Sequence, residues 1–138
     1  ASDPPAPAEL AALRDDALAR LRPAVAEVGA GGTLLGVAGT VTQVAAIHLG
    51  AYDPARVHGL RLTREAVEDV LRTVAAVPAD ARRAVPGLHP DRVGVIVAGA
   101  AILAAVLDAL GAPALVVSER DILDGIAMAP APPGVDAA

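Results

Sequence analysis

Residues 34–43, Leu-Leu-Gly-Val-Ala-Gly-Thr-Val-Thr-Gln, have the types and the order that anion binding requires. A short apolar run ends in glycine and threonine and helical spacing follows at once, which indicates a buried strand that passes directly into a helix. The first N–H groups of a helix have no partner within it and lie at the positive end of its dipole. Gly39 lets an oxyanion approach the backbone, while Thr40 and Thr42 add hydroxyl donors. The segment predicts a phosphate-binding turn; the alternative is a tight turn without a ligand.

Cysteine and histidine content excludes several kinds of site. With no cysteine, the chain has no disulfide, no thiolate nucleophile and no sulfur-ligated metal. Its three histidines (His48, His58 and His89) are not paired at ligand spacing, so no metal site is predicted in this chain. His58 precedes a glycine and is interpreted as a hydrogen-bonding residue at a strand end rather than a base.

Two further clusters favour structural roles. Glu65, Glu68 and Asp69 form an acidic helix face near arginines, which predicts solvated ion pairs rather than a metal site. Ser118 precedes a helical segment and is interpreted as its N-cap. A nucleophilic role for Ser118 is disfavoured because no histidine is placed to activate it.

Composition indicates one acidic domain with an aliphatic core. The 138 residues include no Phe or Trp and a single Tyr, which suits an α/β layer better than a β-sandwich. The net charge of −5 argues against broad nucleic-acid binding. The apolar stretches 28–47 and 93–107 are interrupted or short, so they are interpreted as buried elements rather than membrane spans. The N-terminus has no signal-peptide pattern, and a cytoplasmic location is expected.

Periodicity and turn residues predict an α/β protein with only part of a sheet. Pro23 lies late in the first helical pattern and is expected to kink that helix or end it early. The segment 91–110 is predicted to be the longest and most apolar helix. Thr63 is expected to be the N-cap of the helix that follows it, with Val67, Val70, Leu71 and Val74 as the buried stripe of that helix. The expected elements are a proline-rich lead (1–8), helices over 9–27, 40–48, about 63–77, 91–110 and 119–128, a helical turn within 80–85, buried strands over 34–37 and 114–117, an extended piece over 58–62, a rigid loop at 86–90 and a flexible tail at 130–138.

Four motifs in order resemble a known family. They are Gly-Val-Ala-Gly-Thr at 36–40, Tyr-Asp-Pro followed by Val-His-Gly-Leu-Arg-Leu-Thr within 52–63, Leu-His-Pro-Asp-Arg-Val-Gly-Val-Ile-Val-Ala-Gly-Ala at 88–100, and Val-Val-Ser-Glu-Arg-Asp-Ile-Leu-Asp-Gly-Ile at 116–126. Together, from about Asp3 to Ala129, they resemble the second half of an exopolyphosphatase/guanosine-pentaphosphate phosphohydrolase.

The resemblance implies a partial domain of the ribonuclease H-like fold shared by actin, chaperone ATPases and sugar kinases, with residues 9–129 as a C-terminal half-domain. It implies polyphosphate or guanosine pentaphosphate as substrate and Mg²⁺ as cofactor of the full-length enzyme. The family's phosphate loop and its water-activating Glu belong to a first domain, and its Gly-Gly-Gly-Ser turn opens the second. None of these occurs here. No catalytic residue is therefore expected in this chain, and the chain alone is expected to be inactive without its first-domain partner.

Individual residues follow from the same resemblance. Gly36, Gly39 and Thr40 match the family's phosphate-facing glycine turn. Arg92 matches an arginine at the head of the long helix, where it would contact phosphate or a base; an ion pair with Asp91 is the alternative. Leu123 stands where the family commonly has an arginine, which removes one expected contact with the cleft. Gly99, inside a helix, predicts a close neighbouring backbone rather than a ligand.

Other classes of function stay open at this point. A non-catalytic regulatory or interaction module would keep the fold without turnover. A kinase or ATPase relative would show an adenosine pocket. A half-domain also exposes apolar surface where sheet partners are missing, which favours dimerisation or strand exchange, so a homodimer is an expected assembly.

Overall fold

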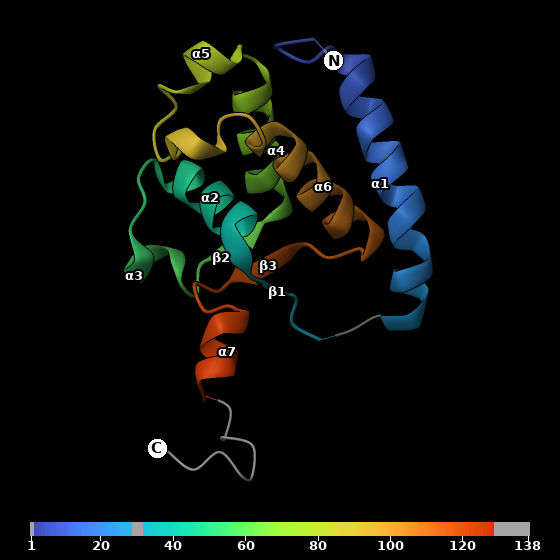
Figure 1. Ribbon diagram of the computed structural model, residues 1–138. Helices are drawn as coiled ribbons and strands as arrows, with labels where there is room; N and C mark the ends of the chain where they lie inside the picture. The colour runs from blue at the N-terminus through green and yellow to red at the C-terminus, as the bar shows by residue number, and fades with distance from the viewer. Residues whose placement is uncertain (1, 29–31, 129–138) are drawn as a thin grey trace, which may run out of the picture.

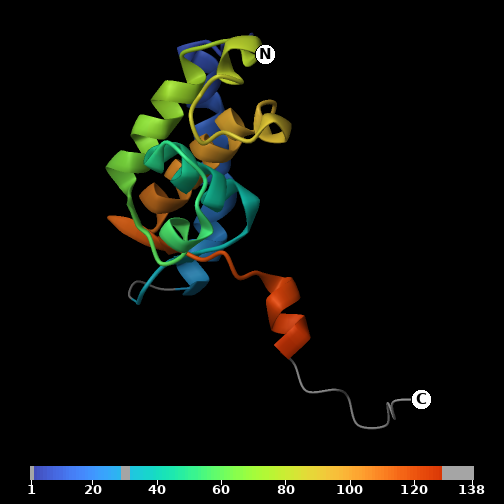
Figure 2. The ribbon, with the colours of Figure 1, turned by 90° about the vertical axis from the view of Figure 1, so that its left-hand side faces the viewer.

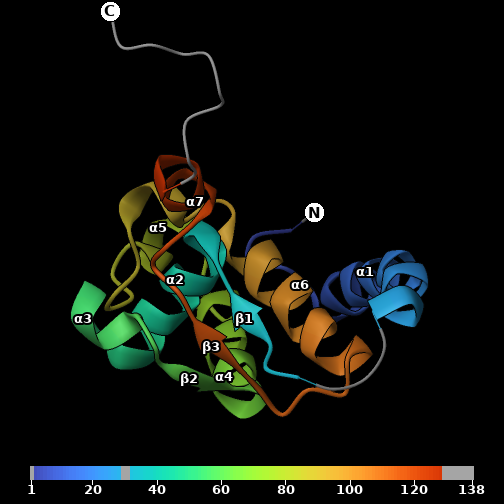
Figure 3. The same cartoon turned by 90° about the horizontal axis from the view of Figure 1, so that it is seen from below.

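A three-stranded mixed sheet lies beneath a layer of helices (Figures 1 and 3). The computed structural model describes residues 2–28 and 32–128, so the tail predicted at 130–138 lies outside the described residues. The central strand β3 (Ala114–Val117) runs parallel to β1 (Leu35–Gly36) and antiparallel to β2 (Arg61–Thr63). Along β3, buried Leu115 and Val117 alternate with the half-buried Val116, because the helices cover one face of the sheet. The predicted α/β class is confirmed, although β3 alternates rather than being buried throughout.

Three helices form the layer over the sheet and enclose an aliphatic core. The helices α2 (Ala38–Leu49), α4 (Arg64–Ala75) and α6 (Ile96–Ala109) contact one another, and α1 (Pro7–Val28) lies along the outer side of α6 (Figure 1). None of the described helices is both long and apolar enough to cross a membrane. The largest fully buried side chains are aliphatic: Leu62, Ile96, Leu107, Val44, Val57, Val67, Val74 and Val117.

The short elements α3 (Pro54–Val57), α5 (Ala79–Arg82) and η1 (Pro90–Arg92) connect these helices, and α7 (Ile122–Met128) stands away from the body (Figure 2). On the edge strand β1, Leu35 is 58% exposed. Every residue of α7 is exposed, including Ile122 and Met128. Apolar surface is thus uncovered in the described part of the chain, and the homodimer stays a prediction.

The structure confirms the interpretation of the segment around α4. The Thr63 hydroxyl accepts a hydrogen bond from the Ala66 N–H at 3.2 Å, so Thr63 is the N-cap. The acidic face of α4 makes ion pairs: Asp69 pairs with Arg72 at 3.0 Å, and Glu68 pairs with Arg14 of α1 at 2.8 Å. The predicted stripe of Val67, Val70, Leu71 and Val74 is buried.

Two helices differ from the prediction in their bounds. The first, predicted over 9–27, spans Pro7–Val28 and does not end early at Pro23. Since Ala19 and Pro23 are exposed, water can replace the hydrogen bond that the proline removes. The helix predicted over 91–110 starts only at Ile96, after η1, because the poor helix former Gly94 lies between them. It is shorter than α1, with 14 residues against 22.

The prediction for Ser118 was also wrong. The last helix starts at Ile122, and its first turn is capped by Asp121, which accepts a hydrogen bond from the Leu123 N–H at 2.8 Å. Asp124 in turn accepts from the Asp121 N–H at 2.8 Å. The Ser118 hydroxyl instead bonds with the backbone of Arg120, both as donor and as acceptor at 3.1 Å. Asp121, in an Asx-type turn, therefore caps the helix in place of the expected Ser118.

Candidate anion-binding site

The chain turns sharply between the end of β1 and the start of α2. Val37 is extended, whereas Ala38 has φ of 69°, in the left-handed region that alanine rarely adopts. The helix therefore begins at Ala38, before the predicted residue 40, and Gly39 and Thr40 lie in its first turn. The predicted passage from strand to helix is confirmed, but the strand predicted to be buried over 34–37 is the two-residue edge strand β1, and Leu35 and Val37 are exposed. The first-turn N–H groups lie at the positive end of the α2 dipole.

The Arg92 guanidinium lies against this first turn. A Cβ atom placed on Gly39 would be 2.5 Å from Arg92 Nη2 and 2.9 Å from its Cζ. The predicted alternative, an ion pair between Arg92 and Asp91, is absent among the described residues. An exposed guanidinium without a carboxylate partner and a helix N-terminus are both sources of positive potential, and together they suit an anion.

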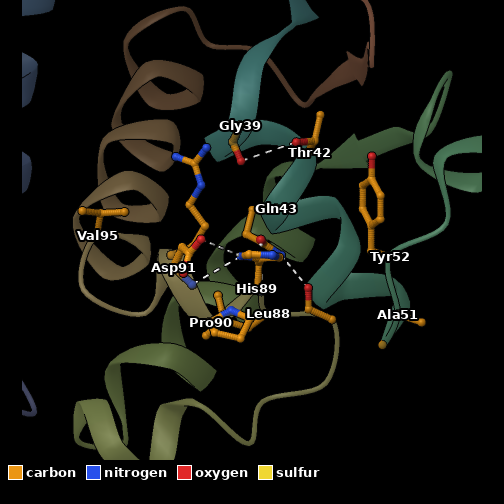
Figure 4. A pocket seen from close by; sticks show the side chains of 13 residues that line it. Gly39, Thr42, Gln43, Ala51, Tyr52, Leu88, His89, Pro90, Asp91 and Val95 are labelled. Carbon is orange, nitrogen blue, oxygen red and sulfur yellow. Dashed lines mark hydrogen bonds and ion pairs between the residues drawn. The ribbon is translucent and has the colours of Figure 1, made fainter.

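A pocket of about 850 Å³ opens beside this contact (Figure 4). Its lining includes Tyr52, whose hydroxyl donates to Glu119 Oε2 at 3.0 Å. That hydrogen bond raises the pKa of Tyr52, so the phenol stays neutral and donating. His58 forms a hydrogen bond as expected, since its Nδ1 accepts from the Glu119 N–H at 3.2 Å, but it ends α3 rather than a strand, because the extended piece predicted over 58–62 starts only at Arg61. The pocket is lined by Gly39, Thr42, Gln43, Gly50, Ala51, Tyr52, Gly87, Leu88, His89, Pro90, Asp91, Arg92 and Val95.

The structure brings some of the predicted site residues together and separates others. Gly39, Thr42 and Arg92 all line the pocket. Gly36 instead allows close packing, because a Cβ there would lie 2.8 Å from both Leu115 Cδ1 and Val41 Cγ1. Phosphate binding by the individual residues Gly36, Gly39, Thr40, Thr42 and Arg92 stays a prediction.

Thr40 turns toward α6 rather than into the pocket. A Cβ on Gly99 would lie 2.7 Å from Thr40 Cγ2, so the helical glycine makes room for this side chain. The expectation of a neighbouring backbone at Gly99 was therefore wrong. Leu123, at the position of the family's arginine, is 69% exposed on α7 and lines no part of this pocket.

Sequence reasoning missed Gln43, a buried polar residue of the pocket. Gln43 is only 7% exposed and hydrogen-bonds to the loop that carries Arg92. Its signal in the sequence was a polar side chain one helical turn after Gly39, surrounded by apolar residues.

The pocket residues do not form a magnesium site by themselves. No group of three or more His, Cys, Asp and Glu side chains that could hold a metal ion occurs within residues 2–28 and 32–128. Among the residues lining the pocket, Asp91 carries the single carboxylate. Mg²⁺ usually keeps several waters and needs carboxylates together with substrate phosphates, so the residues that line this pocket do not by themselves fit the ion.

The mixed sheet, the glycine turn at a helix N-terminus and the arginine over it define an α/β domain with a candidate anion site. Comparison with protein families then identifies the family: the Ppx/GppA phosphatase family matches residues 1–131, and the chain belongs to it. The family is one of hydrolases, and the resemblance stated from the motifs is confirmed.

Similar proteins agree with this assignment. Exopolyphosphatase 2 of Mycobacterium tuberculosis is 35% identical over 135 residues, which cover 92% of this chain and 42% of that protein. The structure of the Aquifex aeolicus PPX-GPPA enzyme matches with a TM-score of 0.82 and 27% identity, covering 91% of this chain and 42% of that one. An exopolyphosphatase from Cytophaga hutchinsonii shares the fold at 17% identity, with a TM-score of 0.77. The expected actin-like fold is confirmed, and the chain spans less than half the length of these relatives.

Proposed function

We propose that this chain forms one wall of the active-site cleft of a phosphohydrolase that releases terminal phosphate from inorganic polyphosphate or guanosine pentaphosphate. The first turn of α2 and Arg92 form the anion site on that wall. The observation that carries the proposal is the contact of the Arg92 guanidinium with Gly39 at the N-terminus of α2, beside an open pocket.

The arrangement suits a phosphoryl group for electrostatic reasons. Backbone N–H groups and a guanidinium can together bind several oxygens of one phosphate, and neither requires a proton transfer to do so. In phosphoryl transfer, catalysis consists largely of positioning and charge stabilisation, which are the tasks that this wall is suited to perform. The same Arg92 position is compatible with stacking on a base, so both substrate classes stay within the proposal.

Catalysis itself is assigned to the part of the longer protein that this chain does not include. Proteins that match this chain are more than twice its length, and the pocket contains no group of metal-binding residues. A water-activating carboxylate and Mg²⁺ are therefore proposed to come from the other wall of the cleft.

The anion site is tested by titrating the 138-residue chain with tripolyphosphate and following the Gly39 amide by NMR. Arg92→Gln is expected to weaken binding about tenfold, the scale of one charge-assisted hydrogen bond. Gly39→Ala is expected to weaken binding similarly because it displaces the guanidinium, while the stability stays equal or rises slightly.

Arg20→Gln is the matched control for these variants. It removes an equal charge from an exposed position on α1, which lies on the other side of α6 from α2 (Figure 1), and its binding should match the unsubstituted chain. If Arg92→Gln and Arg20→Gln weaken binding equally, the affinity reflects net charge alone, and the site is wrongly assigned.

The assignment of catalysis to the other wall of the cleft is tested by measuring phosphate release from long-chain polyphosphate with Mg²⁺. The 138-residue chain is expected to be inactive, while a protein of the relatives' full length that includes it is expected to be active. Turnover by the chain alone would contradict the assignment of catalysis to the other wall. Binding without turnover at full length would support the non-catalytic alternative.

A further inference from the structure

The loop of residues 87–92 lies along one face of α2 (Figure 4) and contacts it at three points. At one end, the Gly87 backbone is so close that a Cβ there would overlap the Ala46 carbonyl oxygen. In the middle, the loop is hydrogen-bonded to Gln43. At the other end, Arg92 covers Gly39. Helix positions 39, 43 and 46 share one face, so the loop runs antiparallel to the helix along that face.

Gln43 makes two hydrogen bonds at the middle point. Its Nε2 donates to the Gly87 carbonyl at 2.5 Å, and its Oε1 accepts from the His89 N–H at 3.1 Å. The carbonyl of His89 accepts in turn from the Arg92 N–H at 2.9 Å. His89 therefore connects the backbone of Arg92 to the buried Gln43 side chain of α2.

We propose that Gln43 is the positioning residue of the anion site, because it sets the register of the 87–92 loop so that the Arg92 guanidinium lies over the first turn of α2. The role follows from geometry: Gly39 and Gln43 are one helical turn apart, and the loop residues that face them, Arg92 and His89, are one η1 turn apart. The inference rests on the proposed function of that turn, and it extends that function to a residue which acts through Arg92.

Fixing the register of the 87–92 loop along α2 favours anion binding, because an exposed arginine otherwise has many side-chain rotamers to lose on binding. A loop held at Gln43 limits where the guanidinium can reach, so less ordering remains to be done when the anion arrives. Without Gln43, the backbone carbonyl of Gly87 and the N–H of His89 lose their partner on α2. The loop is then expected to move toward water, because water can hydrogen-bond to both groups.

The first test needs no ligand. In the 138-residue chain, NMR cross-peaks between the Gly39 α-protons and the Arg92 side chain are expected. Gln43→Met, which keeps the length of the side chain but removes both hydrogen bonds, should abolish these cross-peaks. Val67→Ala is the control, since it removes buried volume from α4 but none of the hydrogen bonds to the loop, and its cross-peaks should remain. Cross-peaks that survive in Gln43→Met would overturn the proposal.

The second test is a double-mutant cycle for tripolyphosphate binding. Gln43→Met is expected to weaken binding about fivefold to tenfold, whereas the double variant with Arg92→Gln should bind no more weakly than Arg92→Gln alone. Full additivity would show that Gln43 acts independently of Arg92, and the proposal would be wrong. If the unsubstituted chain does not bind tripolyphosphate, the proposed anion site fails, while the cross-peak test still decides the role of Gln43.

Discussion

Replacing Arg82 by methionine is expected to lower the free energy of unfolding by about 3 kcal/mol or more. Arg82 is 4% exposed, and its guanidinium donates to the carbonyls of Val74, Val77 and Val93 at 2.7, 2.8 and 3.1 Å. It also donates to Asp3 Oδ1 at 3.0 Å. Methionine fills similar space but leaves the carbonyls without these donors, and each unsatisfied buried group costs about 1–3 kcal/mol.

Urea unfolding of the chain measures this loss, and the neighbouring arginine supplies the control. Arg83 is exposed, so Arg83→Met should change the stability by less than about 0.5 kcal/mol. Asp3→Ala should cost less than Arg82→Met, because the Asp3 side chain is 49% exposed and an exposed ion pair contributes little. Equal effects of the two arginine substitutions would mean that the buried hydrogen bonds of Arg82 do not stabilise the fold.

Gly87→Ala is expected to destabilise the chain by about 3 kcal/mol and to disrupt the pocket as well. Gly87 has φ of 80°, where an alanine costs roughly 1–2 kcal/mol. The added Cβ would also overlap the Ala46 carbonyl oxygen and lie 2.6 Å from its carbon, and neither α2 backbone atom can move freely. The loop must therefore retreat from α2, which breaks the hydrogen bonds to Gln43 and adds about 1–3 kcal/mol.

Substitutions at two other glycines separate the cost of the positive φ from the cost of the lost contact with α2. Gly50 has φ of 75° with open space around it, so Gly50→Ala measures the conformational cost alone. Gly94 has open space and no positive φ, so Gly94→Ala should be neutral or slightly stabilising. Thermal or urea unfolding should rank Gly87→Ala as the most destabilising of the three. A loss no larger than that of Gly50→Ala would show that the contact with α2 adds nothing.

Local patterns in the sequence were sufficient for α4 and for the turn from strand into helix. The spacing of apolar residues in α4, with Thr63 as its cap, depends on neighbours within one helical turn, and the structure confirms both. The passage from β1 into α2 was likewise predicted from consecutive residues. The helix does not end early at Pro23 because the proline is exposed to solvent, and Ser118 is not the cap because the neighbouring Asp121 caps the helix instead.

The sequence by itself determined the α/β class, most helices, the glycine turn and, through its ordered motifs, the family. Only the tertiary structure decided that Arg92 lies over Gly39, that Thr40 fills the space at Gly99, and that Gln43 and Arg82 hold the connecting loops. The physical reason is the range of the forces involved. Helix periodicity and capping act between residues close in the chain, whereas these contacts join segments that meet only after the helices have packed against one another.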